Sequence, residues 1–171
     1  VAVGAAAGSS VTTGSQNTII GGLAGDALTD ADFNIAIGTY ALTSDTLGSR
    51  SVAIGRSALQ SQNFTTATDT YNVAVGHEAG GAVTTGGANT LIGGLAGDAL
   101  TVGNSNVAAG VHALGADTKG DRNVAIGNSA LAAQNFTTST DSYNVALGYA
   151  AGGAVTTGIN NTLIGGLAGD A

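Results

Sequence analysis

The sequence contains no cysteine, proline, methionine or tryptophan among its 171 residues, and aromatic residues make up only 4% of it. Without cysteine, the chain has neither disulfides nor thiolate metal sites. Alanine, valine, isoleucine and leucine supply nearly all of the 43% hydrophobic residues. Any core must therefore consist of many small side chains packed in layers, far from the composition of an average globular domain.

Basic residues are also scarce. The net charge is −7, and the chain has only four basic residues: Arg50, Arg56, Lys119 and Arg122. Nucleic-acid binding depends on clustered lysine and arginine, so a DNA or RNA partner is excluded. No apolar run approaches the roughly 18 residues that span a bilayer, and we expect no membrane insertion by this segment. The chain starts without methionine and stops within a recurring unit, so we expect it to be part of a longer array.

A 72-residue period organises the sequence. The segment NTIIGGLAGDALT at Asn17 returns as NTLIGGLAGDALT at Asn89 and as NTLIGGLAGDA at Asn161. Shorter units of 17, 17, 21 and 17 residues make up each long repeat, starting at positions 17, 34, 51, 72, 89, 106, 123, 144 and 161, after a first unit that lacks its opening residue. We therefore predict that residues 1–171 form a single continuous repeat array.

Three positions of the unit are nearly or fully invariant. The opening residue is asparagine except at Ser51, and the fifth and eighth residues are glycine and alanine in all ten units. The glycine predicts a bend with positive φ or a close backbone approach, the alanine predicts tight packing at a second strand, and the asparagine predicts a stacked amide ladder. In the three units that open the long repeats these structural positions are Asn17, Gly21, Ala24, Asn89, Gly93, Ala96, Asn161, Gly165 and Ala168.

The apolar tract of each unit predicts a strand that is apolar on both faces. In Val52-Ala53-Ile54 the alternation places valine and isoleucine on one face and alanine on the other. Seventeen residues supply about two short strands and two turns, too few to enclose a core, so units must stack with strands about 4.8 Å apart. The sequence predicts an all-β, parallel β-roll or β-solenoid. Its second apolar face needs a partner, and we expect copies of the same chain.

The units NVAIGxxAL and NTLIGGLAG resemble the head repeats of trimeric autotransporter adhesins of the YadA type, over essentially the whole chain. The stretches 51–55 and 123–127 match that family's strand, and Ser57-Ala58 and Ser129-Ala130 match its second strand. Similar arrays occur in bacteriophage tail fibres. The resemblance implies a left-handed roll, a homotrimeric rod and an extracellular place on a cell surface or virion tail fibre. The units here are longer than that family's coils.

Every fourth unit has four extra residues, which predicts a loop on one side of the solenoid. These insertions fall within 60–71 and 132–143 and contain a large share of the aromatic residues: Phe64, Tyr71, Phe136 and Tyr143. Because aromatic rings suit sugar faces and protein anchors, they are the candidate ligand contacts. The favoured alternative is that the rings fold back to cover the edge of the roll.

No pattern predicts a catalytic centre, a cofactor or a metal site. His77 and His112 lie in non-equivalent units, and the nonapeptide of calcium-binding β-rolls is absent. The mixed-charge segment 117–122 is expected to be a turn with loose ion pairs. Solvated charge or turn capping is the expected role of the aspartates that recur in GLAGDA: Asp26, Asp98 and Asp170.

The sequence thus favours a structural and adhesive segment of an extracellular fibre, a rigid trimeric rod that contacts a host-surface glycan or protein repeatedly. Ice binding by a threonine array is the alternative, although the pairs Thr12-Thr13, Thr84-Thr85 and Thr156-Thr157 recur only once per long repeat. A polysaccharide-degrading tailspike is less favoured, and we expect no enzyme, because no cluster of charged residues or histidines breaks the repeat.

Overall fold

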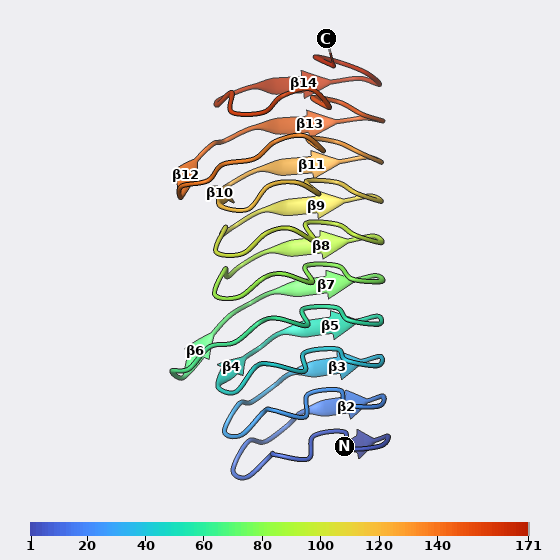
Figure 1. Ribbon diagram of the computed structural model, residues 1–171, viewed down its shortest axis with the longest axis vertical. Coiled ribbons are helices and arrows are strands. Elements are labelled where there is room, and N and C mark those ends of the chain that lie inside the picture. Colours follow the sequence, from blue (N-terminus) through green and yellow to red (C-terminus); the bar gives the residue numbers. More distant parts are fainter. Residues whose placement is uncertain (171) are drawn as a thin grey trace.

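The computed structural model describes residues 1–170, which form a column of stacked coils (Figure 1). No helix is present in this range. One parallel sheet holds ten strands in the order β1 (Ala2–Val3), β2 (Thr18–Ile20), β3 (Ile35–Ile37), β5 (Val52–Ile54), β7 (Val73–Val75), β8 (Thr90–Ile92), β9 (Val107–Ala109), β11 (Val124–Ile126), β13 (Val145–Leu147) and β14 (Thr162–Ile164). The predicted all-β solenoid is confirmed.

The strand register follows the sequence units. Ile35 pairs with Val52, one 17-residue unit further on, and Val52 pairs with Val73 across the 21-residue unit. Equivalent residues therefore lie directly above one another along the column, which is why a short motif repeated in sequence becomes a continuous column in space (Figure 1).

The core is a column of small side chains inside the coils. In β5 the central Ala53 is fully buried, while Val52 and Ile54 on either side of it are only partly covered. The eighth residue of the unit is buried as well, as at Ala24 and Ala96. Valine and isoleucine therefore face outward and alanine faces inward, as the alternation predicts.

The eighth-residue alanines do not lie on a second strand, which corrects that expectation. They sit in tight turns, where the N–H of Ala24 donates to the carbonyl of Gly21 over 3.3 Å. Residues on both sides of the alanine take positive φ, as at Leu23 (56°) and Gly25 (49°). This alternation of left-handed and right-handed residues folds the chain back without using a strand, and the sequence pattern does not reveal it.

Both explanations for the invariant glycine hold at once. Gly21 has φ of 137°, and a Cβ built on it would lie 2.6 Å from the carbonyl carbon and oxygen of Gly38 in the next coil. Gly93 has φ of 129° and the same relation to Gly110, at 2.6 Å from its oxygen. Any side chain at this position would be strained in φ and would also push adjacent coils apart.

The predicted asparagine ladder is present and buried. Asn17 Oδ1 accepts the N–H of Asn34 over 2.9 Å, and Asn17 Nδ2 donates to the carbonyl of Ala31 over 2.7 Å. The same pair of bonds joins Asn89 to Asn106 and to Gly103. Each amide therefore ties its own coil closed and binds the next coil, which satisfies backbone groups that water cannot reach.

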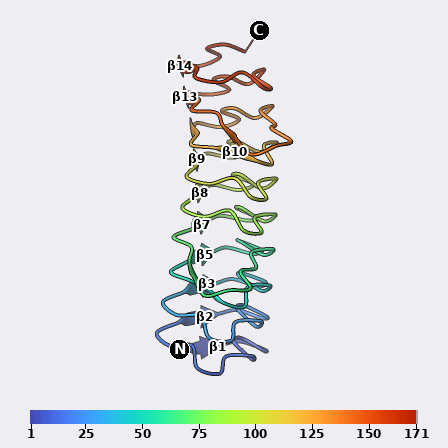
Figure 2. The same cartoon turned by 90° about the vertical axis from the view of Figure 1, so that its left-hand side faces the viewer.

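Each 21-residue coil has a short strand at one corner of the column, which pairs with a short strand of the 17-residue coil before it. β4 (Gly48–Ser49) pairs with β6 (Thr68–Asp69), and β10 (Gly120–Asp121) pairs with β12 (Thr140–Asp141). Both pairs project on the same side of the column (Figures 1 and 2). The insertion thus forms a loop on one side, where the sequence placed it.

Candidate functional site

The aromatic residues of the inserted coils separate into two groups. Phe64 and Phe136 are buried, with 9% and 7% of their surface exposed. Tyr71 and Tyr143 are exposed by 57% and 50%. Only the tyrosines are therefore available to a ligand, whereas the phenylalanines cover the edge of the roll.

A buried polar network holds the first inserted coil in place. Asp45 is fully buried, and its Oδ1 accepts the backbone N–H groups of Gly48 over 3.1 Å and Phe64 over 2.9 Å. Its Oδ2 accepts the side-chain amide of Gln62 over 2.5 Å, and Gln62 Oε1 in turn accepts Asn72 Nδ2 over 2.8 Å. Every partner of the carboxylate donates, so its buried negative charge is compensated.

The second inserted coil repeats this network. Asp117 is fully buried and accepts Gly120 N–H over 3.0 Å, Phe136 N–H over 3.1 Å and the amide of Gln134 over 2.6 Å. The expectation that 117–122 is a turn with loose ion pairs is therefore wrong for Asp117. The Asp117 carboxylate is buried because the backbone N–H groups of Gly120 and Phe136 need a hydrogen-bond acceptor inside the roll.

The residue at the twelfth position of the unit is the sequence signal for these networks. The twelfth position of the unit is apolar and buried in two neighbouring coils, at Leu28 and Val83, so aspartate and glutamine there are exceptions at a core position. Both exceptions recur 72 residues later, at Asp117 and Gln134. Alignment of the units on their asparagine would have revealed them.

Beside the first inserted coil lies an exposed column of residues, formed by the residues that directly precede the opening position of three successive units (Phe33, Arg50 and Tyr71) together with Asp69. Arg50 Cζ lies 4.8 Å from the ring centre of Phe33, and Arg50 Nε lies 2.9 Å from Asp69 Oδ2. The hydroxyl of Tyr71 donates to the same Asp69 oxygen over 3.3 Å. The column therefore holds two aromatic rings, a guanidinium and a carboxylate on three consecutive coils.

The equivalent column in the second long repeat differs at one residue. Ser105 replaces the phenylalanine, and Arg122 instead lies with its Cζ 5.7 Å from the ring centre of Tyr143. Arg122 also pairs with Asp141, as Arg50 does with Asp69. The arginine thus contacts the phenylalanine where one is present and the tyrosine where it is absent.

The second surface of interest is the outer face of the ten-stranded sheet. Its side chains are those at the first and third strand positions, mostly valine, isoleucine and threonine with one alanine and one leucine, and the sheet lines one side of the column (Figure 2). Several isoleucines leave 36–45% of their surface exposed: Ile20, Ile35, Ile92 and Ile126. A parallel sheet with one apolar face exposed is unusual, because such sheets are normally covered on both faces.

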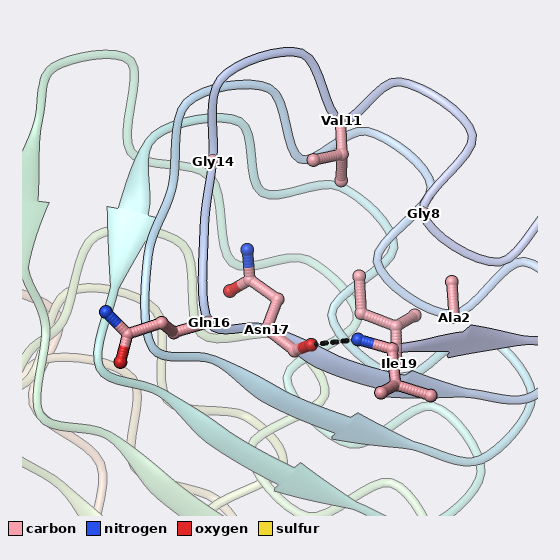
Figure 3. A pocket seen from close by; sticks show the side chains of 8 residues that line it. Ala2, Gly8, Val11, Gly14, Gln16, Asn17 and Ile19 are labelled. Carbon is pink, nitrogen blue, oxygen red and sulfur yellow. Dashed lines mark hydrogen bonds between the residues drawn. The ribbon is translucent and has the colours of Figure 1, made fainter.

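A hollow of about 200 Å³ opens at the first coil, lined by Ala2, Gly8, Val11 and Ile19 among others (Figure 3). These residues are core positions of the roll, and the second coil covers them on one side. The hollow is mostly apolar and contains no charged side chain. It is therefore the open cross-section of the solenoid at the first coil.

The aspartates of the GLAGDA segments differ between the long repeats. Asp26 Oδ1 accepts the hydroxyl of Thr43, whereas Asp98 Oδ1 is buried without a hydrogen-bond partner. Gly115 replaces the threonine beside Asp98, and burial raises the pKa of the Asp98 carboxyl. Within residues 1–170 no group of three or more histidine, aspartate or glutamate side chains is placed to hold a metal ion.

A single file of threonines also runs along the column, at the thirteenth position of most units. The hydroxyl of Thr29 donates to the carbonyl of Thr46 over 3.1 Å, and that of Thr101 donates to Thr118 over 2.9 Å. The pairs of adjacent threonines in the sequence do not reveal this file, because most of its members are single threonines one unit apart. Its hydroxyls donate to carbonyl groups of the neighbouring coil.

Over the described residues, no helix has the length and apolarity needed to cross a membrane. Comparisons of the chain with protein-family models, with curated proteins and with solved structures found no match.

Proposed function

We propose that this chain is a structural and adhesive segment of an extracellular fibre, on a cell surface or a virion tail, and that it works as a rigid homotrimeric rod of left-handed rolls. The observation that supports this function best is the outer sheet face, which presents apolar side chains along all ten strands and against which no other part of residues 1–170 packs as a second layer. An apolar strip of this length favours burial against another surface.

Copies of the same chain are the best-matched partner for this face. Its periodicity is set by the coil, so a second copy offers the same spacing of apolar side chains over the whole column, whereas an unrelated globular partner would match only a few coils. Low charge on the strands assists burial, because the strand residues at these positions are valine, isoleucine, leucine, alanine or threonine. The threefold arrangement and the handedness follow from the resemblance to trimeric adhesin heads.

Rigidity follows from the ladders that join every coil to the next. Strand hydrogen bonds, the glycine column and the asparagine amides each repeat along the axis. A rod of this kind can hold weakly binding groups at a fixed pitch, and simultaneous contacts then raise the overall affinity for a host surface. The function is mechanical and multivalent, without a catalytic step.

A charge placed on the outer face tests this proposal. Ile92→Lys puts an ammonium group in the middle of the apolar strip, and we expect the mass in solution to fall from the oligomer to the single chain of 16.2 kDa. Thr66→Lys, on the exposed loop of the first insertion, is the matched control and should leave the mass unchanged. Equal behaviour of the two variants would contradict the outer face as the interface.

A further inference from the structure

We infer that the exposed columns beside the two inserted coils are carbohydrate-binding subsites for neutral hexose-containing glycans, and that the first is stronger than the second. The inference rests on the proposed adhesive function and names its ligand class. The first subsite consists of Phe33, Arg50, Asp69 and Tyr71, and the second of Arg122, Asp141 and Tyr143. The two are one long repeat apart, four coils or roughly 19 Å along the axis.

The chemistry of these residues suits a pyranose. A tyrosine ring that is half exposed offers a flat apolar face to the C–H face of a sugar. The neighbouring carboxylate accepts hydrogen bonds from sugar hydroxyls, and the guanidinium donates to them. Because Arg50 and Asp69 already neutralise each other over 2.9 Å, and because the whole chain has a charge of −7, a neutral glycan fits better than a polyanionic one.

The buried polar network around Asp45 holds the first subsite in position. Buried Asp45 accepts backbone N–H groups from Gly48, the first residue of β4, and from Phe64, in the inserted coil ahead of β6. The backbone of Phe64 and the ring it buries hold the loop against the roll. A rigid platform loses little conformational freedom when a ligand binds, which favours weak contacts repeated along a fibre.

The difference between the two columns sets their order of affinity. In the first, Arg50 stacks on Phe33, so both faces of the Tyr71 ring are free of the guanidinium. In the second, Ser105 provides no ring, and Arg122 lies over one face of Tyr143. A sugar that stacks on the same face of Tyr143 must displace Arg122, so one of the two faces is obstructed, whereas a sugar that stacks on Tyr71 displaces no cation.

Screening of the intact chain on an array with neutral, sialylated and sulfated glycans tests the ligand class. We expect signals on neutral hexose-containing glycans, and binding to acidic glycans alone, or to none, would overturn the inference. The best neutral oligosaccharide is then titrated by isothermal titration calorimetry, whose signal does not depend on the tyrosines that the variants remove. Tyr71→Ala combined with Tyr143→Ala should reduce affinity at least tenfold. Alanine is accommodated there, since Ala88 takes the same φ region in the equivalent position.

Two controls separate stacking from loss of structure. Tyr149→Ala removes a tyrosine that is 64% exposed and has no arginine of residues 1–170 stacked on its ring, and should change affinity less than twofold. The exchanges Phe33→Ser and Ser105→Phe convert each column into the other, so the first should weaken binding and the second strengthen it severalfold. Opposite or equal shifts in the exchanges, or equal losses in all tyrosine variants, would overturn the inference.

The oligomeric state is measured on the same samples, so the two proposals fail separately. A chain that binds glycan as a monomer keeps the subsites and contradicts the trimeric rod. A trimer that binds no neutral glycan contradicts the subsites alone.

Discussion

The side-chain amide of Gln134 donates a 2.6 Å hydrogen bond to Oδ2 of Asp117, and both side chains are fully buried inside the roll. This pair lies between two successive coils, at a position that other coils fill with leucine or valine. It joins the coil before the insertion to the inserted coil itself, so the insertion is positioned by a polar contact within an otherwise apolar column.

Asp117→Asn is expected to destabilise the protein strongly. The substitution replaces a carboxylate that only accepts hydrogen bonds by an amide, one end of which would face the donors of Gly120, Phe136 or Gln134. An unsatisfied buried donor costs roughly 1–3 kcal/mol, and more where a charged partner is lost. Denaturant unfolding followed by circular dichroism measures the loss. Asp30→Asn, at an exposed aspartate, is the control and should lie within about 0.5 kcal/mol of the parent.

Two adjacent glycines are expected to respond in opposite ways to alanine. Gly93→Ala places a Cβ 2.6 Å from the Gly110 oxygen at a φ of 129°, and should cost at least about 2 kcal/mol. Gly94→Ala has open space within 4 Å of its Cβ and no positive φ, and should be neutral or stabilise by up to about 1 kcal/mol. Thermal unfolding of the two variants separates the outcomes. A similar loss at both positions would contradict the close approach of the coils.

Gly115→Thr should stabilise the second long repeat. It restores the hydroxyl that Thr43 provides to Asp26 and gives buried Asp98 Oδ1 a donor, a gain of about 1 kcal/mol. The new Cβ would lie 3.1 Å from the His112 carbonyl oxygen, so the backbone must shift slightly. Gly115→Ala adds the Cβ without the hydroxyl and is the control. If alanine stabilises as much as threonine, the gain does not come from the hydrogen bond.

The pH dependence of stability should change at Asp98. Burial raises the pKa of this carboxyl above 3.8, so the folded state binds the proton more tightly than the unfolded chain does. Its contribution to stability is therefore present below pH 3.8 and is lost as pH rises through the raised pKa. Asp98→Asn removes that loss, so the variant should gain stability relative to the parent between pH 3 and pH 7. A constant difference across this range would contradict the raised pKa.

The repeat made the architecture predictable. The glycine at the position of Gly21 recurs in every coil, and the asparagine at the position of Asn17 in every complete opening except Ser51. A unit too short for its own core has to stack, which leads to the parallel solenoid and to the amide ladder. The turn around Ala24 was not predictable in the same way, because the positive φ at Leu23 comes from coil closure, and the equivalent positions of the other units hold residues of many types.

The candidate site was only half visible in the sequence. The aromatic residues of the insertions predicted Phe64 and Tyr71 as candidate contacts. Phe64 is buried and Tyr71 exposed because the loop folds back onto Asp45, which the sequence does not indicate. The contact between Arg50 and Phe33 joins residues 17 positions apart, and the chain gives no local sign of it. Such contacts become apparent only when the units are placed in register.

The mass of the purified chain in solution tests the central claim most directly, since the trimeric rod requires the outer apolar face to be buried. Light scattering over a dilution series should give a mass near 49 kDa, three times the 16.2 kDa of one chain. A monomer that stays folded and soluble at all concentrations would contradict the account, because ten strands would then expose their apolar face to water.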